Sequence, residues 1–270
     1  MSKTSVFRLE TLEALPEATL QEHTRDTQLL LKGLTLLKCS GDLALITHSS
    51  KSIVWLGRMA ESNTRVVIKH YLDRQHYEAE ISGYLVFRGG PMGQVLHSDA
   101  NRQLIILSHL PGRAPRATQE DLSKVIQAYA LMHAAAVSNL AFGWQYAQGA
   151  ELDSCCSAHA RPVLGRHPVS IGDVKPEHII ITQEGVRIID LETWSLQRTV
   201  WFDILSLTRF MLPGKMQHAN LKWIVRQYCH FRGCSPDEYD MSKIKRCLEE
   251  IRGLSNQRDY VEGAFNEMDV

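Results

Sequence analysis

Two short apolar runs in the second half of the chain constrain its fold more than any other feature. They are Ile179–Thr182 and Val186–Ile189, and the three residues between them end in Gly185. A three-residue hairpin loop usually needs a positive φ angle at its last position, which glycine adopts without steric cost. The pattern therefore predicts an antiparallel hairpin in which Thr182 faces Val186.

The same register brings two polar side chains together at the open end of the hairpin. It makes His178 and Asp190 direct cross-strand neighbours, whose Cβ atoms would lie roughly 4.5–5.5 Å apart. The loop just before the first strand carries Asp173, Lys175 and Glu177. Carboxylates, an imidazole and an ammonium group are therefore expected within a few residues of one another.

These residue types are the ones that phosphoryl transfer needs. One carboxylate must lie near the attacking hydroxyl, a second must hold a divalent cation, and a cationic group must offset the charge on the transferred phosphoryl. Asp173, Asp190 and Lys175 supply such groups, and His178 supplies a further metal donor. The segment predicts a phosphoryl-transfer site.

The letters of this segment also resemble a known pattern. The catalytic loop of the protein-kinase superfamily is similar to the segment D-V-K-P-E-H-I-I. The flanking segments are more similar to the small-molecule branch of that superfamily, the aminoglycoside phosphotransferase and choline kinase type; they read I-G-D and I-I-D-L-E. The resemblance implies that Asp173 is the catalytic aspartate and that Lys175 contacts phosphate. It implies that Asp190 and His178 are the metal ligands.

Two positions depart from the pattern of that branch. Ile171 stands where a histidine is usual, and His178 stands where an asparagine is usual. Mg²⁺ prefers oxygen ligands, whereas imidazole suits Mn²⁺ better. We therefore expect Mg²⁺ or Mn²⁺ as the cofactor, with a site that responds unusually well to Mn²⁺.

A second part of the predicted site lies in the N-terminal half. The strand Arg65–Tyr71 contains V-V-I-K, which resembles the V-A-I-K of kinases and implies that Lys69 grips nucleotide phosphates. The lysine is normally held by a glutamate of the next helix, here about Gln75–Arg88, and Glu78 and Glu80 compete for that role. The apolar residues three and seven positions after Glu78 favour Glu78.

Two further segments are expected to contact the nucleotide. The turn before the strand Ile53–Arg58 lacks the usual glycines, but Ser50 and Ser52 supply donors for phosphate oxygens. By resemblance, Ser108 and Leu110 belong to the hinge whose backbone meets the adenine ring. The expected nucleotide is ATP, and GTP is the alternative.

The remaining chain is expected to be mainly helical. One helix runs from Thr118, as its N-cap, to about Val137, and His133 on its apolar stripe is expected to be buried and hydrogen-bonded. By resemblance, Asp203 bonds the backbone of the catalytic loop. An amphipathic helix over 220–232 should stop at Gly233.

The fold class that follows is α+β and two-lobed, of the protein-kinase-like type. Residues 1–108 would form a nucleotide-binding lobe with an antiparallel sheet and one helix, and 109–270 a mainly helical catalytic and acceptor-binding lobe. The expected activity is ATP-dependent transfer of the γ-phosphoryl group to a hydroxyl of an aminoglycoside-, sugar- or amino-alcohol-like molecule.

Two alternatives remain open from the sequence. A Ser/Thr protein kinase needs a long peptide-docking segment after the metal aspartate, and only thirteen positions separate Asp190 from Asp203. A nucleotide-binding pseudokinase is favoured by His178, Ile171 and the glycine-free turn, whereas the presence of Lys69 argues against it.

Composition narrows the possible partners. The chain has 270 residues, 22% of them charged, with 30 basic and 30 acidic residues and a formal net charge of +0. This balance points to neither a nucleic-acid partner nor an anionic membrane surface. No apolar run approaches the roughly 18 residues of a membrane helix, and the first ten residues lack a secretory pattern. A cytoplasmic protein with reduced cysteines is expected.

Overall fold

The computed structural model describes residues 14–32, 43–143, 169–172, 174–195, 200, 203–204, 206–207 and 221–233. The chain divides into two units. The sheet unit comprises Glu10–Ser82 and Gly93–Pro111, and the helical unit comprises Gly83–Met92 and the chain from Gly112 onward. The lobe boundary after Ser108 that the sequence suggested stays a prediction.

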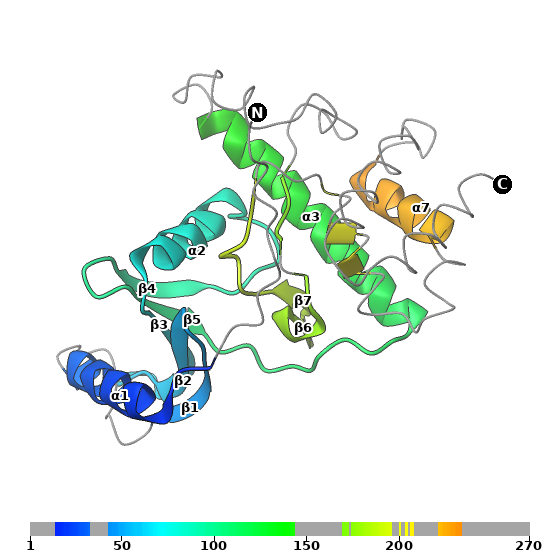
Figure 1. The fold of residues 1–270 in the computed structure, drawn as a ribbon. Helices are drawn as coiled ribbons and strands as arrows, with labels where there is room; N and C mark the ends of the chain where they lie inside the picture. The colour runs from blue at the N-terminus through cyan, green and yellow to red at the C-terminus, as the bar shows by residue number, and fades with distance from the viewer. Residues whose placement is uncertain are drawn as a thin grey trace, which may run out of the picture. The chain divides into compact units, whose positions relative to one another are not determined.

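The sheet unit is built on one five-stranded antiparallel sheet (Figure 1). Neighbouring strands follow the order β1-β2-β3-β5-β4, so the only departure from chain order is the exchange of the last two. The strands are β1 (Ala44–His48), β2 (Ser52–Arg58), β3 (Arg65–Tyr71), β4 (Val95–Asp99) and β5 (Leu104–Ser108). The bounds of β3 are those that the sequence predicted.

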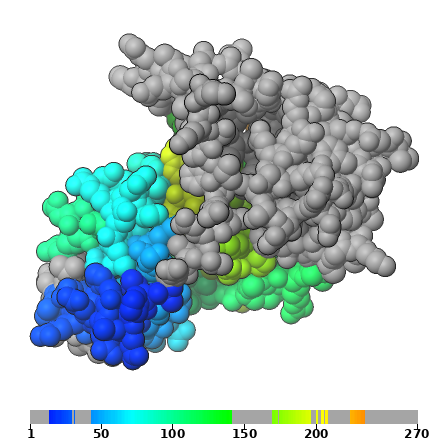
Figure 2. Space-filling view, in the orientation of Figure 1, coloured from blue at the N-terminus to red at the C-terminus, as the bar shows by residue number. Residues whose placement is uncertain are grey.

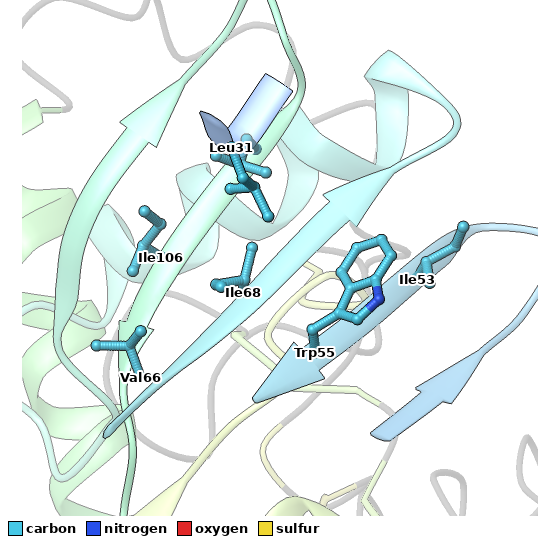
Figure 3. Packing of buried hydrophobic residues seen from close by; sticks show 7 residues of the cluster. Leu31, Ile53, Trp55, Val66, Ile68 and Ile106 are labelled. Atoms are coloured by element: carbon cyan, nitrogen blue, oxygen red, sulfur yellow. The ribbon is translucent and has the colours of Figure 1, made fainter. Parts of the chain in front are cut away.

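One face of this sheet carries the apolar core of the unit. Side chains of β2, β3 and β5 gather there with Leu31 of the helix α1 (Glu17–Lys32), as Figure 3 shows. The hydroxyl of Thr27 in the same helix lies 2.7 Å from Nδ1 of His70 on β3. The helix α1 has only a narrow apolar stripe, because polar residues make up most of its length. Its other side forms part of the molecular surface (Figure 2).

The opposite face of the sheet carries Lys69. Side chains alternate along a strand, so Lys69 and Tyr71 point away from Val66 and Ile68. All four side chains are buried, because β3 is a central strand covered on both faces. The helix α2 (Arg74–Val86) follows β3 and supplies the partner of Lys69 described below.

The helical unit contains two long helices among its described residues. The helix α3 (Gln119–Gly143) extends beyond the predicted end at Val137. Thr118 Oγ1 accepts the N–H of Asp121 at 3.3 Å, which confirms the predicted N-cap. The helix α7 (Leu221–Arg232) ends at Gly233, whose φ of 69° confirms the predicted glycine stop. None of the helices that the structure describes combines the length and hydrophobicity needed to cross a membrane.

The predicted hairpin is present as β6 (Ile179–Thr182) and β7 (Gly185–Ile188), but its register is shifted by one residue. Thr182 pairs with Gly185 instead of Val186. Thr182 Oγ1 accepts the N–H of Glu184 and donates to the carbonyl of Gly185, which closes the turn one residue earlier than expected. Gly185 has a φ of 124°, so its predicted positive φ is confirmed.

A linker segment lies beside this hairpin. The backbone of Arg113 exchanges hydrogen bonds of 2.8 and 3.1 Å with Ile181 of β6. A Cβ atom at Gly112 would lie 2.6 Å from both Ile180 Cγ2 and the Ile181 carbonyl oxygen. The close approach of the linker to the hairpin therefore requires glycine at position 112.

Candidate active-site residues

In the sheet unit, Lys69 forms a buried ion pair with Glu80. Lys69 Nζ lies 2.5 Å from Glu80 Oε2, and the side chains are 10% and 1% exposed. The predicted partner, Glu78, is wrong, because its side chain is 59% exposed and bonds Arg74 at 2.7 Å instead.

The rotation of α2 about its axis decides between the two glutamates. Tyr77, Glu80 and Tyr84 are buried at spacings of three and four residues, which is one helix face. Leu85, the apolar residue seven positions after Glu78 that favoured the Glu78 prediction, is 62% exposed. Tyr77 and Tyr84, three residues before and four residues after Glu80, were the signal that could have identified Glu80. The aliphatic residues of the helix indicated a different face.

An aromatic ring also contacts the buried lysine. Lys69 Nζ lies 5.0 Å from the centroid of the Tyr71 ring, and Tyr77 packs edge-on against Tyr71 with ring centroids 6.2 Å apart. The negative face of an aromatic ring attracts a cation at such distances. Tyr71 and Glu80 together restrict where the ammonium group can lie.

The serine turn before β2 is organised by a residue that the sequence analysis missed. Ser49 Oγ accepts the backbone N–H groups of Lys51 and Ser52, both at 3.2 Å. Ser50 is exposed at the tip, whereas Ser52 is buried at the start of β2. Phosphate contacts by Ser50 and Ser52 stay predictions.

The hinge residues lie at and just beyond the end of β5. The N–H of Ser108 donates to the carbonyl of Gln94 at 2.9 Å, and Ser108 Oγ accepts the N–H of Gln94 at 3.2 Å. Leu110 is half-buried. The predicted contact of this backbone with an adenine ring is untested.

In the helical unit, the predicted catalytic loop is described on both sides of Asp173, which itself lies outside the described residues. Lys175 is half-buried and precedes a single 3₁₀ turn, η2 (Pro176–His178). The carbonyl of Lys175 accepts the N–H of His178 at 3.0 Å. This turn leads directly into β6.

His178 and Asp190 meet, but not as the direct cross-strand pair that the sequence predicted. The carbonyl of His178 accepts the N–H of Ile189, so Ile189 faces His178 in the observed register. Asp190 then adopts a left-handed φ of 62°, which interrupts the strand alternation. Nε2 of His178 and Oδ2 of Asp190 lie 3.2 Å apart, with the side chains 15% and 26% exposed.

The donors around Asp190 suit a divalent cation. Carboxylate oxygens of Asp190 and Glu192 lie within 4.8 Å of each other. Carboxylates are the ligands that Mg²⁺ and Mn²⁺ prefer, and the imidazole of His178 is better matched to Mn²⁺. The residues present therefore fit the expected metal ion.

A buried carboxylate anchors the segment that precedes Asp173. Asp203 accepts the N–H groups of Ile171 at 2.7 Å and Gly172 at 3.1 Å, and the hydroxyl of Ser170 at 2.7 Å. The predicted bonding of Asp203 to the loop backbone is confirmed. His133 also bonds Asp203, at 2.9 Å, and is fully buried, as predicted.

The same segment is held from a second side. Ser170 and Ser195 exchange two backbone hydrogen bonds of 2.8 and 2.9 Å. Gly172 has a φ of 102°, and a Cβ atom there would lie 2.3 Å from the carbonyl oxygen of Thr193. Only glycine fits, so Gly172 is required by the local backbone.

Comparison with solved structures places this fold among those of small-molecule kinases. The chain is similar to the choline kinase LicA from Streptococcus pneumoniae, with a TM-score of 0.54 and 12% identity over 93% of this chain and 96% of that one. It is similar to an ethanolamine kinase from Plasmodium vivax, with a TM-score of 0.50 and 12% identity over 86% and 83% of the two chains. No family model and no curated protein matches the sequence.

These similarities define the fold. The chain has the two-lobed α+β kinase-like fold of small-molecule kinases, which confirms the fold class and the resemblance read from the sequence. The helix α1 is an addition to the single helix expected in the N-terminal lobe.

Proposed function

We propose that the chain is an ATP-dependent phosphotransferase that moves the γ-phosphoryl group to a hydroxyl of a small molecule. The observation that carries the proposal is the buried pair of Lys69 and Glu80. Kinases require a lysine of the third strand to be paired with a glutamate of the following helix. A buried ion pair contributes little net stability, so its burial is better explained by a function of the lysine.

Each residue has a separate task in the proposed reaction. Lys69, oriented by Glu80, would contact nucleotide phosphate oxygens, and Asp190 with His178 and Glu192 would hold the metal ion. The metal, when bound, would neutralise charge on the phosphates. Asp173 would take the proton of the acceptor hydroxyl. The hydroxyl oxygen would then bond to the γ-phosphorus as the bond between that phosphorus and the leaving ADP breaks.

General-base catalysis of this kind typically contributes about 10²–10⁴ in rate. Lys175 would add positive charge near the transferred group. The contacts of the loop that leads to Asp173 support the role of Asp173 as the general base. Asp203 bonds the loop backbone at Ile171 and Gly172, and Ser195 bonds it at Ser170.

The acceptor class is the finer part of the proposal. Choline and ethanolamine, which the two similar kinases are named for, are amino alcohols. They support an acceptor with a primary hydroxyl and a cationic nitrogen, alongside the sugar and aminoglycoside classes.

The test is nucleotide turnover by purified protein with ATP or GTP, with Mg²⁺ or Mn²⁺, against a panel of amino alcohols, sugars and aminoglycosides. We expect acceptor-dependent formation of ADP that Asp173→Ala abolishes and that Glu184→Gln, an exposed change in the turn of the hairpin, leaves intact. Nucleotide binding without turnover on any acceptor would favour the pseudokinase alternative. Absence of nucleotide binding would remove the basis of the proposal.

A further inference from the structure

A continuous chain of buried hydrogen bonds runs from α7 to the loop before Asp173. The hydroxyl of Tyr228 on α7 lies 2.8 Å from Nδ1 of His133 on α3. Nε2 of the same imidazole lies 2.9 Å from Oδ2 of Asp203. All three side chains are at most 1% exposed, so water does not compete for these bonds.

The donors and acceptors of this chain can be assigned from its geometry. Oδ1 of Asp203 accepts from Ser170 Oγ and the N–H of Gly172, and Oδ2 accepts from the N–H of Ile171 and from His133. These four bonds match the roughly four lone-pair positions of a carboxylate. His133 Nε2 therefore carries a hydrogen, and in the neutral ring Nδ1 accepts the hydroxyl hydrogen of Tyr228.

We propose that His133 and Tyr228 are positioning residues for the catalytic loop. This inference rests on the proposed function, and it adds two residues that touch neither nucleotide nor acceptor. Tyr228 fixes the tautomer and the orientation of His133, and His133 supplies one of the four donors that hold the Asp203 carboxylate. Asp203 in turn fixes the backbone of Ile171 and Gly172, one residue before Asp173.

The packing around the imidazole explains why the effect should reach the loop. The ring of His133 is enclosed edge-on by Tyr129 and Tyr228, with centroids 6.1 and 5.7 Å away. It cannot rotate to find another acceptor without displacing these rings. Loss of the Tyr228 hydroxyl would leave a buried acceptor on Nδ1, and loss of the imidazole would leave Asp203 short of one donor.

The first measurement is backbone amide hydrogen exchange in the full-length protein, which needs no substrate. In Tyr228→Phe we expect the exchange protection of the Ile171 and Gly172 amides to fall roughly tenfold, the size expected for one lost buried hydrogen bond. His133→Leu should lower it further, and His133→Gln, which retains an N–H donor, should recover part of the loss.

Val225→Ala is the matched control. Val225 is buried on α7 as Tyr228 is, but its side chain has no polar atom to join the hydrogen-bond chain. The variant tests whether simple loosening of α7 is enough to release the loop. We expect global destabilisation with little change in protection at Ile171 and Gly172 beyond that of neighbouring amides.

The second measurement is acceptor-independent ATP hydrolysis with Mn²⁺ or Mg²⁺. A misplaced loop should lower kcat by about tenfold or more, since small displacements of catalytic groups are costly, while KM for ATP stays within about twofold. Val225→Ala should leave both values near those of the unchanged protein when corrected for the folded fraction.

The outcomes separate this inference from the proposed function. Loss of protection together with loss of kcat supports both. Loss of protection in a protein that turns over no ATP, either alone or with any acceptor of the panel, supports the hydrogen-bond chain and contradicts the proposed function. Unchanged protection in Tyr228→Phe and His133→Leu, equal loss in Val225→Ala, or lost protection with unchanged kcat would each overturn the positioning role.

Discussion

Each of the two units contains one close pair of side chains with a role in the proposed reaction, and the pairs differ in kind. Lys69 and Glu80 are buried and lie 2.5 Å apart between a central strand and a helix. His178 and Asp190 lie 3.2 Å apart at the end of a two-stranded hairpin and are partly exposed. The side chains of the first pair are 10% and 1% exposed, whereas those of the second, at 15% and 26%, keep more surface that a ligand can reach.

The difference indicates what each pair can do. A buried lysine held by a carboxylate and an aromatic ring is pre-oriented and needs no rearrangement to meet a phosphate. A partly exposed histidine and aspartate can exchange their mutual contact for a metal ion. We expect substitutions in the sheet unit to affect stability and activity together, and substitutions at the hairpin to affect activity and metal binding alone.

The largest effect is expected at Asp190. Asp190→Asn keeps a side chain that tolerates the left-handed φ of 62° but removes the charge of the proposed metal ligand. Metal-ion stabilisation of several kcal/mol corresponds to a loss of about 10³-fold in ATP turnover. Steady-state kinetics measure this, and Mn²⁺ titration should show weakened binding with an unchanged unfolding midpoint. A variant that binds metal normally would contradict the assignment.

Substitution in the buried pair of Lys69 and Glu80 should lower the stability of the protein. Lys69→Met leaves the Glu80 carboxylate buried after its ammonium is removed, so the free energy of unfolding should fall by about 3–5 kcal/mol. Urea unfolding measures this. The exposed pair of Arg74 and Glu78 is the matched control, and Glu78→Gln should change the free energy of unfolding little, because solvent screens the pair.

The double variant Lys69→Met with Glu80→Leu separates stability from function. Two apolar side chains of similar size should restore most of the lost stability. ATP turnover should remain abolished, because the phosphate contact is gone. Restored turnover in the double variant would show that the pair is only structural.

A third pair gives a reference outside the proposed chemistry. The guanidinium of Arg113 bonds both carboxylate oxygens of Asp121 and lowers the pKa of that carboxyl from 3.8 to about 2, and the N–H of Arg116 adds to the effect. A pKa that is lower in the folded state stabilises the fold above pH 3.8, and this contribution disappears as the pH falls from 3.8 towards 2.

Arg113→Met should therefore lower the free energy of unfolding at neutral pH and change it little near pH 2. Urea unfolding of both proteins across this range measures the difference, and Lys124→Met, which removes an exposed pair with Glu120, is the control. A cost that does not change with pH would mean that Arg113 acts through packing alone.

The smallest effect concerns the metal preference. The ratio of Mn²⁺ affinity to Mg²⁺ affinity should be about tenfold or more higher in the unchanged protein, which has the imidazole donor, than in His178→Asn. Changes around metal ligands produce effects of this size. Competition titrations followed by the paramagnetic signal of Mn²⁺ measure this without catalysis. Equal activity and equal binding with both metals over a full concentration series would sink the idea.

Much of the fold was predictable because its signals are local. The residue pattern of Arg65–Tyr71 indicated the bounds of β3, and Thr118 and Gly233 marked a helix start and a helix end. Turn geometry was less reliable, because the hydroxyl of Thr182 closed the hairpin one residue earlier than the apolar pattern implied.

The sequence by itself determined which chemical groups the proposed site would use, since the spacing of Asp173, His178 and Asp190 follows from the chain alone. Only the tertiary structure decided which groups pair. Glu78 and Glu80 point about 200° apart on a helix of 3.6 residues per turn, and the burial of tyrosines on α2 selected Glu80. Contacts between distant segments depend on such rotations, and the aliphatic pattern of α2 indicated the wrong one.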